Sequence, residues 1–344
     1  LIKTAQQKIG QYQYQESIET FQQALAIARK IKDREKEALA KVGLGFNYSH
    51  IGKPQEALNF YNEALIIFRE VRDRSAEAST LNHIGAVYRN IGQPQKALEF
   101  YQKSLPILRE VDYPSAEAST LNHIGYVYRS IDKPQKALEY YKKALPILQE
   151  VGARYGEAST LNHIGYVYRS IGKPKKALAY YKKALLILQA VGYRSAEATT
   201  LNHIGAVYRS IGQPQKALEF YEKALPIMQE VGDRSQEATT LNNIGGVYLS
   251  IDKPQKALEY YEKALPITQE VGDRLGKATT LNNIGGVYSD IGKPQKALAF
   301  YEYALPITQE VGDRSGVATT LRGIGEVYNT IGQPQKALEY YEKA

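Results

Sequence analysis

A nine-residue phrase, Thr-Leu-Asn-His/Asn-Ile-Gly-x-Val-Tyr, recurs along this chain of 344 residues at a constant spacing of 40 residues. Its copies begin at Thr80, Thr120, Thr160, Thr200, Thr240 and Thr280. A second phrase, rich in Ala, Leu and Tyr, follows each copy, as in residues 253–265. A fixed period between about 20 and 50 residues is typical of stacked units that pack only against their neighbours. The spacing therefore predicts a repeat array rather than a globular core.

Each repeat is expected to hold two α-helices. In the repeat that starts near residue 233, Leu241, Ile244 and Tyr248 lie at i, i+3 and i+7, which is the spacing of one helical face. Pro254 suits the first position of a second helix, where a missing N–H costs nothing. Tyr261 belongs to the apolar stripe of that second helix. We expect an all-α solenoid of antiparallel helix pairs, without strands.

Glycine at one position inside the first helix indicates a close helix contact. A helical glycine costs about 1 kcal/mol relative to alanine, so its recurrence implies a packing reason common to all repeats. It stands at Gly45, Gly85, Gly125, Gly165, Gly205, Gly245, Gly285 and Gly325. Prolines inside the second helix should each remove one backbone bond and bend its last turns. They are Pro106, Pro146, Pro226, Pro266 and Pro306, with Ile66 and Leu186 at the same place in two straighter helices.

Composition limits the classes of function. The chain has no Cys, so we expect neither disulfides nor thiolate metal sites, which suits a cytoplasmic location. The net charge of +8 is spread over mixed Lys, Arg, Glu and Asp, unlike the clustered charge of a nucleic-acid-binding surface. No apolar run approaches the ~18 residues that cross a membrane. We expect no nucleic-acid, membrane or cofactor binding, and no enzyme, because no nucleophile, base or metal site comes together.

We interpret residues 1–344 as a single array of about eight and a half repeats, truncated at both ends. The chain stops at Ala344, inside an expected helix. Apolar surface near Ile9, Leu338 and Tyr341 would then lack a covering neighbour. End-to-end self-association through these uncapped repeats is one expectation.

The fold signature resembles a known repeat family. It consists of Leu241, Ile244, Gly245, Tyr248, Ala257, Tyr261 and Ala264. This pattern looks like the tetratricopeptide (TPR) repeat, and it covers nearly the whole chain. The 40-residue unit, longer than the family's common 34, is similar to the repeats of kinesin light chain and Pins-type spindle adaptors. The resemblance implies a right-handed superhelix whose concave wall is made of the first helices.

A narrower resemblance concerns the linkers between repeats. Their recurrent Val-Gly-Asp-Arg-Ser wording is similar to TPR arrays of bacterial proteins that continue into a caspase-like CHAT domain. Without Cys, this chain itself carries no Cys/His dyad.

A row of asparagines is the first candidate for ligand binding. The residues are Asn82, Asn122, Asn162, Asn202, Asn242 and Asn282. A carboxamide has both a donor and an acceptor, so it can pair with any peptide unit. Kinesin light chain uses groove asparagines in this way. The alternative is that each Asn bridges to the next repeat or solvates the wall.

Arginines and tyrosines share that helix face, at i+7 and i+4 from the asparagines. The arginines are Arg89, Arg129, Arg169 and Arg209, which suit carboxylates or phosphates, or serve the helix dipole at the C-terminal turn. Tyr126 and Tyr166 are aromatic platforms or pack on each other across repeats. Later repeats carry Gly246 and Gly286 at the tyrosine position. Either a ligand backbone comes close there, or no contact requires a side chain at this place.

Histidines at residues 83, 123, 163 and 203 favour a structural role. Adjacent repeats lie ~10 Å apart, too far for neighbouring imidazoles to share one metal ion.

These features together predict a non-catalytic scaffold that binds a protein or peptide. The ligand would be an extended, acidic segment in the concave groove. Two alternatives stay open: a sensor arm of a larger effector, such as a CHAT protease, and an architectural spacer that assembles end to end.

Overall fold

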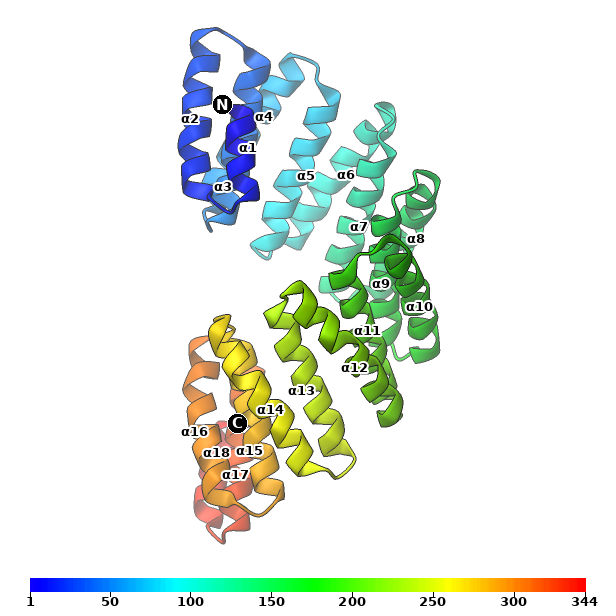
Figure 1. Ribbon diagram of the computed structural model, residues 1–344. Helices are drawn as coiled ribbons and strands as arrows, with labels where there is room; N and C mark the ends of the chain where they lie inside the picture. Colours follow the sequence, from blue (N-terminus) through cyan, green and yellow to red (C-terminus); the bar gives the residue numbers. More distant parts are fainter. The chain divides into compact units, whose positions relative to one another are not determined.

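The computed structural model describes all residues, 1–344, and contains 18 α-helices and no strand (Figure 1). In chain order the helices are α1 (Ile2–Gly10), α2 (Tyr14–Lys30), α3 (Arg34–His50), α4 (Pro54–Glu70), α5 (Arg74–Asn90), α6 (Pro94–Glu110), α7 (Pro114–Ser130), α8 (Pro134–Glu150), α9 (Arg154–Ser170), α10 (Pro174–Val191), α11 (Arg194–Ser210), α12 (Pro214–Val231), α13 (Arg234–Ser250), α14 (Pro254–Glu270), α15 (Arg274–Asp290), α16 (Pro294–Glu310), α17 (Arg314–Thr330) and α18 (Pro334–Lys343).

The helices form two compact units, residues 1–171 and residues 172–344. We call the odd-numbered helices A helices and the even-numbered helices B helices. Within each unit, an A helix packs antiparallel against the B helix that follows it, and that B helix packs against the next A helix (Figure 1). Successive A helices also touch, as α5 touches α7. The expected all-α solenoid fold of antiparallel helix pairs is confirmed.

Local signals set the limits of these helices. The side chain of Asp233 caps α13 by accepting a hydrogen bond of 3.1 Å from the Gln236 backbone N–H. Proline occupies the first turn of the B helices from α4 onward, where no N–H is needed. Gly192 ends α10 with a φ of 74°, a left-handed conformation that favours glycine.

The recurrent glycine of the A helix lies directly against a tyrosine ring of the B helix. A Cβ added to Gly125 would lie 2.6 Å from Tyr141 Cε1, and Tyr141 is fully buried. The same contact joins Gly45 to Tyr61, Gly85 to Tyr101, Gly205 to Tyr221, Gly245 to Tyr261, Gly285 to Tyr301 and Gly325 to Tyr341. The predicted packing reason is therefore confirmed: the bare backbone makes room for the ring.

The residues expected in one shared core are buried with one partial exception. Leu241, Ile244, Ala257 and Tyr261 are all buried. Tyr248 is only half-buried, because its ring stacks on Tyr260 at the edge of the pair, with ring centroids 5.4 Å apart. The Lys256 amino group lies 5.3 Å from the Tyr248 ring centroid and covers it further.

The B helices continue through their internal prolines. Pro106 lies within α6 and would have bonded to the carbonyl of Gln102, so that carbonyl loses its helical partner. Both residues are exposed, and water can satisfy the carbonyl. Helix α12 with Pro226 and helix α10 with Leu186 have the same length of 18 residues. Proline therefore does not shorten the helix, and the expected extra bend stays a prediction.

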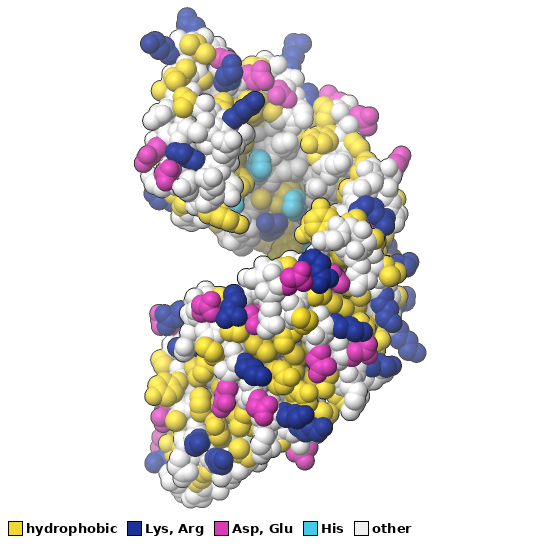
Figure 2. Space-filling view, viewed as in Figure 1, with side chains coloured by type: hydrophobic (Ala, Val, Ile, Leu, Met, Phe, Trp, Pro, Cys, Tyr) yellow, Lys and Arg dark blue, Asp and Glu magenta, His cyan; other side chains and the backbone are white.

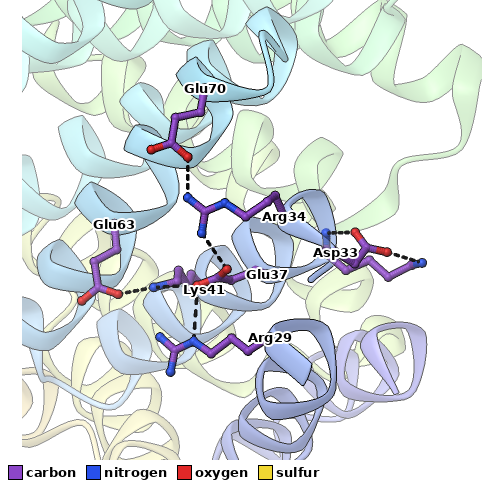
Figure 3. Close-up of polar contacts among 8 residues, drawn as sticks. Arg29, Asp33, Arg34, Glu37, Lys41, Glu63 and Glu70 are labelled. Atoms are coloured by element: carbon purple, nitrogen blue, oxygen red, sulfur yellow. Dashed lines mark hydrogen bonds and ion pairs between the residues drawn. The ribbon is translucent and has the colours of Figure 1, made fainter. Parts of the chain in front are cut away.

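A charge network that the sequence patterns did not predict joins α3 to both neighbouring B helices (Figure 3). Glu37 of α3 accepts hydrogen bonds from Arg29 of α2 at 3.3 Å and from Arg34 at 2.8 Å. Arg34 also pairs with Glu70 at the end of α4. Glu37 is buried, so its two arginines offset the cost of removing its charge from water.

The same network recurs through most of the array. Glu77 takes the place of Glu37 and pairs with Arg69 and Arg74, and Arg74 pairs with Glu110. From Glu157 to Glu237 a glutamine replaces the arginine of the preceding B helix, at 2.9 to 3.0 Å. The corresponding positions in α15 and α17 are Lys277 and Val317, which cannot make this contact.

Apolar side chains of α18 are exposed as expected. Leu338 is 57% exposed and Tyr341 is 40% exposed. Self-association through them stays a prediction.

The glycine–tyrosine contact predicts opposite effects for two neighbouring glycines. Gly285→Ala should destabilise the protein by about 1–3 kcal/mol, because the new methyl group would lie 2.9 Å from Tyr301 Cε1. Gly286→Ala is the matched control: its methyl group would meet only the Tyr301 hydroxyl, at 3.7 Å, and should stabilise the helix by up to about 1 kcal/mol. Thermal melts of the two variants check this, and an equal or raised melting temperature for Gly285→Ala would contradict it.

The charge network predicts a pH-dependent contribution from Glu37. Burial raises the pKa of Glu37, but its hydrogen bonds to Arg29 and Arg34 outweigh burial and hold the pKa below its usual value. A group with a lowered folded-state pKa stabilises the protein above its unfolded pKa of about 4.3 and loses that effect as the pH falls through the folded-state value.

Glu37→Gln should therefore lower the melting temperature at pH 7. Its deficit relative to the unmodified protein should shrink as the pH falls toward 3. Melts of both proteins across that range provide the measurement, and a deficit that stays constant with pH would show that the charge of Glu37 contributes nothing.

Candidate functional site

The asparagine row bridges successive A helices. Asn82 Nδ2 donates to Thr120 Oγ1 at 2.8 Å, and Thr120 in turn donates to the Ala116 carbonyl. Equivalent bonds join Asn122 to Thr160, Asn202 to Thr240 and Asn242 to Thr280, at 2.7 to 2.8 Å. In the last bridge the direction is reversed, because the Thr320 hydroxyl donates to Asn282 Oδ1 at 3.0 Å. Asn162 holds the same position on α9. The expected alternative, a bridge to the next repeat, is what the structure shows at these positions.

Ligand binding by the same asparagines remains a prediction, and the structure limits which of their amide atoms a ligand can reach. The carboxamide oxygens of Asn82 and Asn122 are buried and have no hydrogen-bond partner. A ligand therefore cannot reach these two oxygens.

The arginines and tyrosines of the first unit form one continuous stack, which we call the Arg–Tyr ladder. It consists of Arg89, Tyr126, Arg129, Tyr166 and Arg169. The Tyr126 ring has the Arg89 guanidinium at 5.3 Å and that of Arg129 at 4.6 Å. The Tyr166 ring has Arg129 at 4.5 Å and Arg169 at 5.2 Å. The tyrosines do not pack on each other, because an arginine lies between them.

The ladder leaves its positive charges without acidic partners. No carboxylate lies within ion-pairing distance of Arg89, Arg129 or Arg169, and Arg89 bonds only to the neutral Asn90 amide. Elsewhere in the repeats most arginines are paired, as in the charge network. Each ladder arginine also lies in the last turn of its helix, where the dipole favours a cation. The helix ends and the tyrosine rings thus stabilise the cations, and the unpaired guanidinium groups favour anions along this face.

Arg209, in the second unit, has different surroundings. The residue that would stack on it is Gly246, so no ring covers its guanidinium. A Cβ on Gly246 would lie 2.9 Å from Arg209 Nη2. Beside them opens a pocket of about 480 Å³. It is lined by Arg209, Thr239, Asn242, Asn243, Gly246, Tyr261, Asp273, Leu275, Gly276, Thr279 and Asn283.

The histidines stack on the buried tyrosine of the preceding B helix. His123 lies on Tyr101 and His163 on Tyr141, with ring centroids 5.5 and 5.3 Å apart. Burial, together with Arg89 and His83, lowers the pKa of His123 to about 4, so it is neutral at pH 7. Histidine side chains line a hollowed face of the first unit, and opposite charges are interspersed over the surface (Figure 2). No cluster of His, Asp or Glu in the structure could hold a metal ion.

The sequence patterns predicted the ladder residues as candidates for binding, but they did not predict that the arginines stack on the tyrosines. The available signal is a tyrosine three residues before one arginine and 37 residues after another, as Tyr126 stands to Arg129 and Arg89. The pocket had no signal of its own except the change from His and Tyr to Asn and Gly in the later repeats.

The profile of the tetratricopeptide repeat family matches the chain in overlapping segments. They are residues 6–70, 37–110, 76–150, 116–190, 156–230, 196–270, 236–310 and 276–344. The chain belongs to the tetratricopeptide repeat family. Repeats of this family generally form scaffolds through which proteins interact, and this chain is a TPR scaffold.

Solved TPR structures share the fold at low sequence identity. The sensor-bearing STAND protein PH0952 from Pyrococcus horikoshii is 17% identical with a TM-score of 0.69, over 96% of this chain and 52% of that one. The quorum sensor NprR from B. thuringiensis is 15% identical with a TM-score of 0.69, over 99% and 96%. A Rap protein complexed with competence and sporulation factor is 15% identical with a TM-score of 0.63, over 99% and 94%.

Two other comparisons complete the description of this TPR chain. No curated protein sequence matches it significantly. None of its helices has the length and apolar character needed to span a bilayer.

The asparagine bridges predict an energetic coupling between repeats. Asn82→Ala and Thr120→Val should each destabilise the TPR array, and a double-mutant cycle should give a coupling of about 1 kcal/mol, the usual net value of one hydrogen bond. The control cycle pairs Asn82→Ala with Thr160→Val, which belongs to a different bridge and should be additive. Chemical unfolding measures both cycles, and equal coupling in the two would mean that the Asn82 bridge has no specific role.

Proposed function

We propose that this chain binds an extended, acidic peptide segment along the A-helix face of its first unit. The observation that carries the proposal is the Arg–Tyr ladder: three guanidinium groups in a row, held by two tyrosine rings, with no carboxylate partner. Guanidinium groups form charge-assisted hydrogen bonds with carboxylates, and stacking on tyrosine fixes their planes in advance. The ligand would supply the missing acidic groups.

The spacing of the ladder supports an extended ligand. Arg89 and Arg129 both contact Tyr126, at 5.3 and 4.6 Å from its ring centroid, so they lie at most about 10 Å apart. Packed helices are separated by a similar distance, about 8–10 Å. An extended chain advances about 3.3 Å per residue, so about three residues span one repeat. A polypeptide with acidic side chains at this spacing would reach successive arginines.

The asparagines have a secondary part in this proposal. The second amide N–H of each would donate to a backbone carbonyl of the ligand, while the first N–H holds the threonine bridge. This role adds affinity for any peptide, whereas the arginines select for acidic ones.

A sensor arm of a larger effector is the second candidate. It is supported by the fold that this chain shares with the TPR sensor of the STAND protein and with the quorum sensor NprR. The same acidic ligand would then act as the signal, and a further domain would read it.

Loss of two ladder arginines should weaken acidic peptides selectively. We expect Arg129→Ala with Arg169→Ala to raise the Kd for a peptide with Glu at every third residue by roughly tenfold. The same variant should bind the Gln counterpart of that peptide as the unmodified protein does. The loss should shrink at high salt, because screening already weakens the charged contacts of the unmodified protein.

Isothermal titration with both peptides measures these effects. Lys142→Ala with Lys182→Ala is the matched control, since it removes the same charge from exposed positions on B helices. Adding Asn122→Ala should weaken both peptides equally. Acidic peptides bound equally by the arginine variant and the lysine control would rule out the ladder as the binding site.

A further inference from the structure

The pocket at Gly246 occupies a place that a tyrosine fills elsewhere in the chain. Counting 37 residues on from Arg89 and Arg129 leads to Tyr126 and Tyr166, whose rings those arginines contact. The same count from Arg209 leads to Gly246. The chain thus repeats the arginine but omits the ring, and the guanidinium of Arg209 lies over bare backbone.

We propose that this pocket receives an aromatic side chain of a bound polypeptide, which stacks on Arg209 in place of the missing tyrosine. The site lies wholly in the second unit and does not depend on the Arg–Tyr ladder for its formation.

The charges around the pocket favour an aromatic ring over a carboxylate. Arg209 has neither an acidic partner nor a ring over it, so its planar cation is available for stacking. Asp273 is the acidic residue of the lining, and its carboxylate is held in place by the Gly276 N–H at 2.8 Å, where it caps α15. A ligand carboxylate would be repelled by Asp273, whereas a neutral ring would not.

The rest of the lining suits a side chain attached to a peptide. Leu275 is 50% exposed and offers an apolar contact. Asn243 and Asn283 present amide groups that can pair with a peptide unit or with a polar ring edge such as an indole N–H. The volume of about 480 Å³ lies within the range of ordinary ligand pockets.

Two substitutions in the sequence account for the opening. Gly246 lacks the side chain that Tyr126 and Tyr166 have at the same position. Asn283 stands where His123 stacks on Tyr101, so the equivalent Tyr261 lines the pocket instead of lying under an imidazole. The tyrosine and histidine that other repeats carry at these two positions are therefore suitable substitutions for closing the pocket.

The test uses N-acetyltryptophanamide as a neutral aromatic probe. The chain has no Trp, so the fluorescence anisotropy of the probe can be followed without a protein tryptophan signal. The full chain should give saturable binding. Arg209→Gln should weaken it by about fivefold, the loss of one cation–π contact. Gly246→Tyr should abolish it by filling the pocket, and Asn283→His should reduce it by covering Tyr261.

The controls separate this site from the others. Arg129→Gln removes an equivalent arginine in the first unit and should leave probe binding unchanged, even if the acidic peptide is lost. Thermal melts verify that each variant is folded, and Gly246→Ala serves in place of Gly246→Tyr if the latter does not fold.

Several results would overturn the proposal. One is the absence of saturable binding, and another is equal binding of N-acetylleucinamide, which has no ring. Displacement of the probe by N-acetylglycine but not by N-acetyltyrosinamide would assign the pocket to carboxylates. If free indole bound as tightly as the amide probe, the peptide groups would contribute nothing to binding. That result would refute the claim that the aromatic ring belongs to a bound polypeptide.

Discussion

The contact of a B-helix tyrosine ring with a bare A-helix glycine is the constraint on which this array depends. It sets how closely the two helices of a repeat approach, because any side chain at Gly125 would occupy the space of the Tyr141 ring. The ring then lies at the floor of the A-helix face, where His123, His163 or Asn283 covers or exposes it in different repeats. The same tyrosine ring thus sets the packing of the repeat and forms part of its surface. The scaffold stays constant while the residues above each ring vary.

Hydrogen bonds and ion pairs between helices fix the alignment of each repeat against the next. The asparagine bridges fasten successive A helices on one face, and the network around the buried glutamates fastens α3, α5, α11 and α13 to the B helices on both sides. Both use polar groups that would be costly to bury alone, so each is stable only when its partner repeat is in place. The Arg–Tyr ladder uses the same regular spacing, but its half-buried guanidinium groups have no carboxylate partner, which leaves their charge available to a ligand.

The sequence predicted the fold in detail and the site only in part. A constant period and helical spacing sufficed for the helix pairs, for the buried Tyr261 and for the packing role of Gly245. The partner of Asn82 could not be predicted, because it lies 38 residues away and the offset depends on how the A helices stack. The contact of Arg129 with Tyr166 depends on that same stacking of A helices, and the charge network around Glu37 depends on how A and B helices pack. Contacts inside a repeat follow from periodicity, whereas contacts between repeats require the packed geometry.

The buried glutamate of the charge network is missing from the last two A helices, where Lys277 and Val317 replace it. In a linear array, cooperativity is carried by the coupling between nearest neighbours. Helices α15 to α18 therefore lack the bond between a buried glutamate and the preceding B helix that is present in α5, α11 and α13. Partial unfolding would begin there, and amide protons in that segment would exchange with solvent while the rest of the array stays folded.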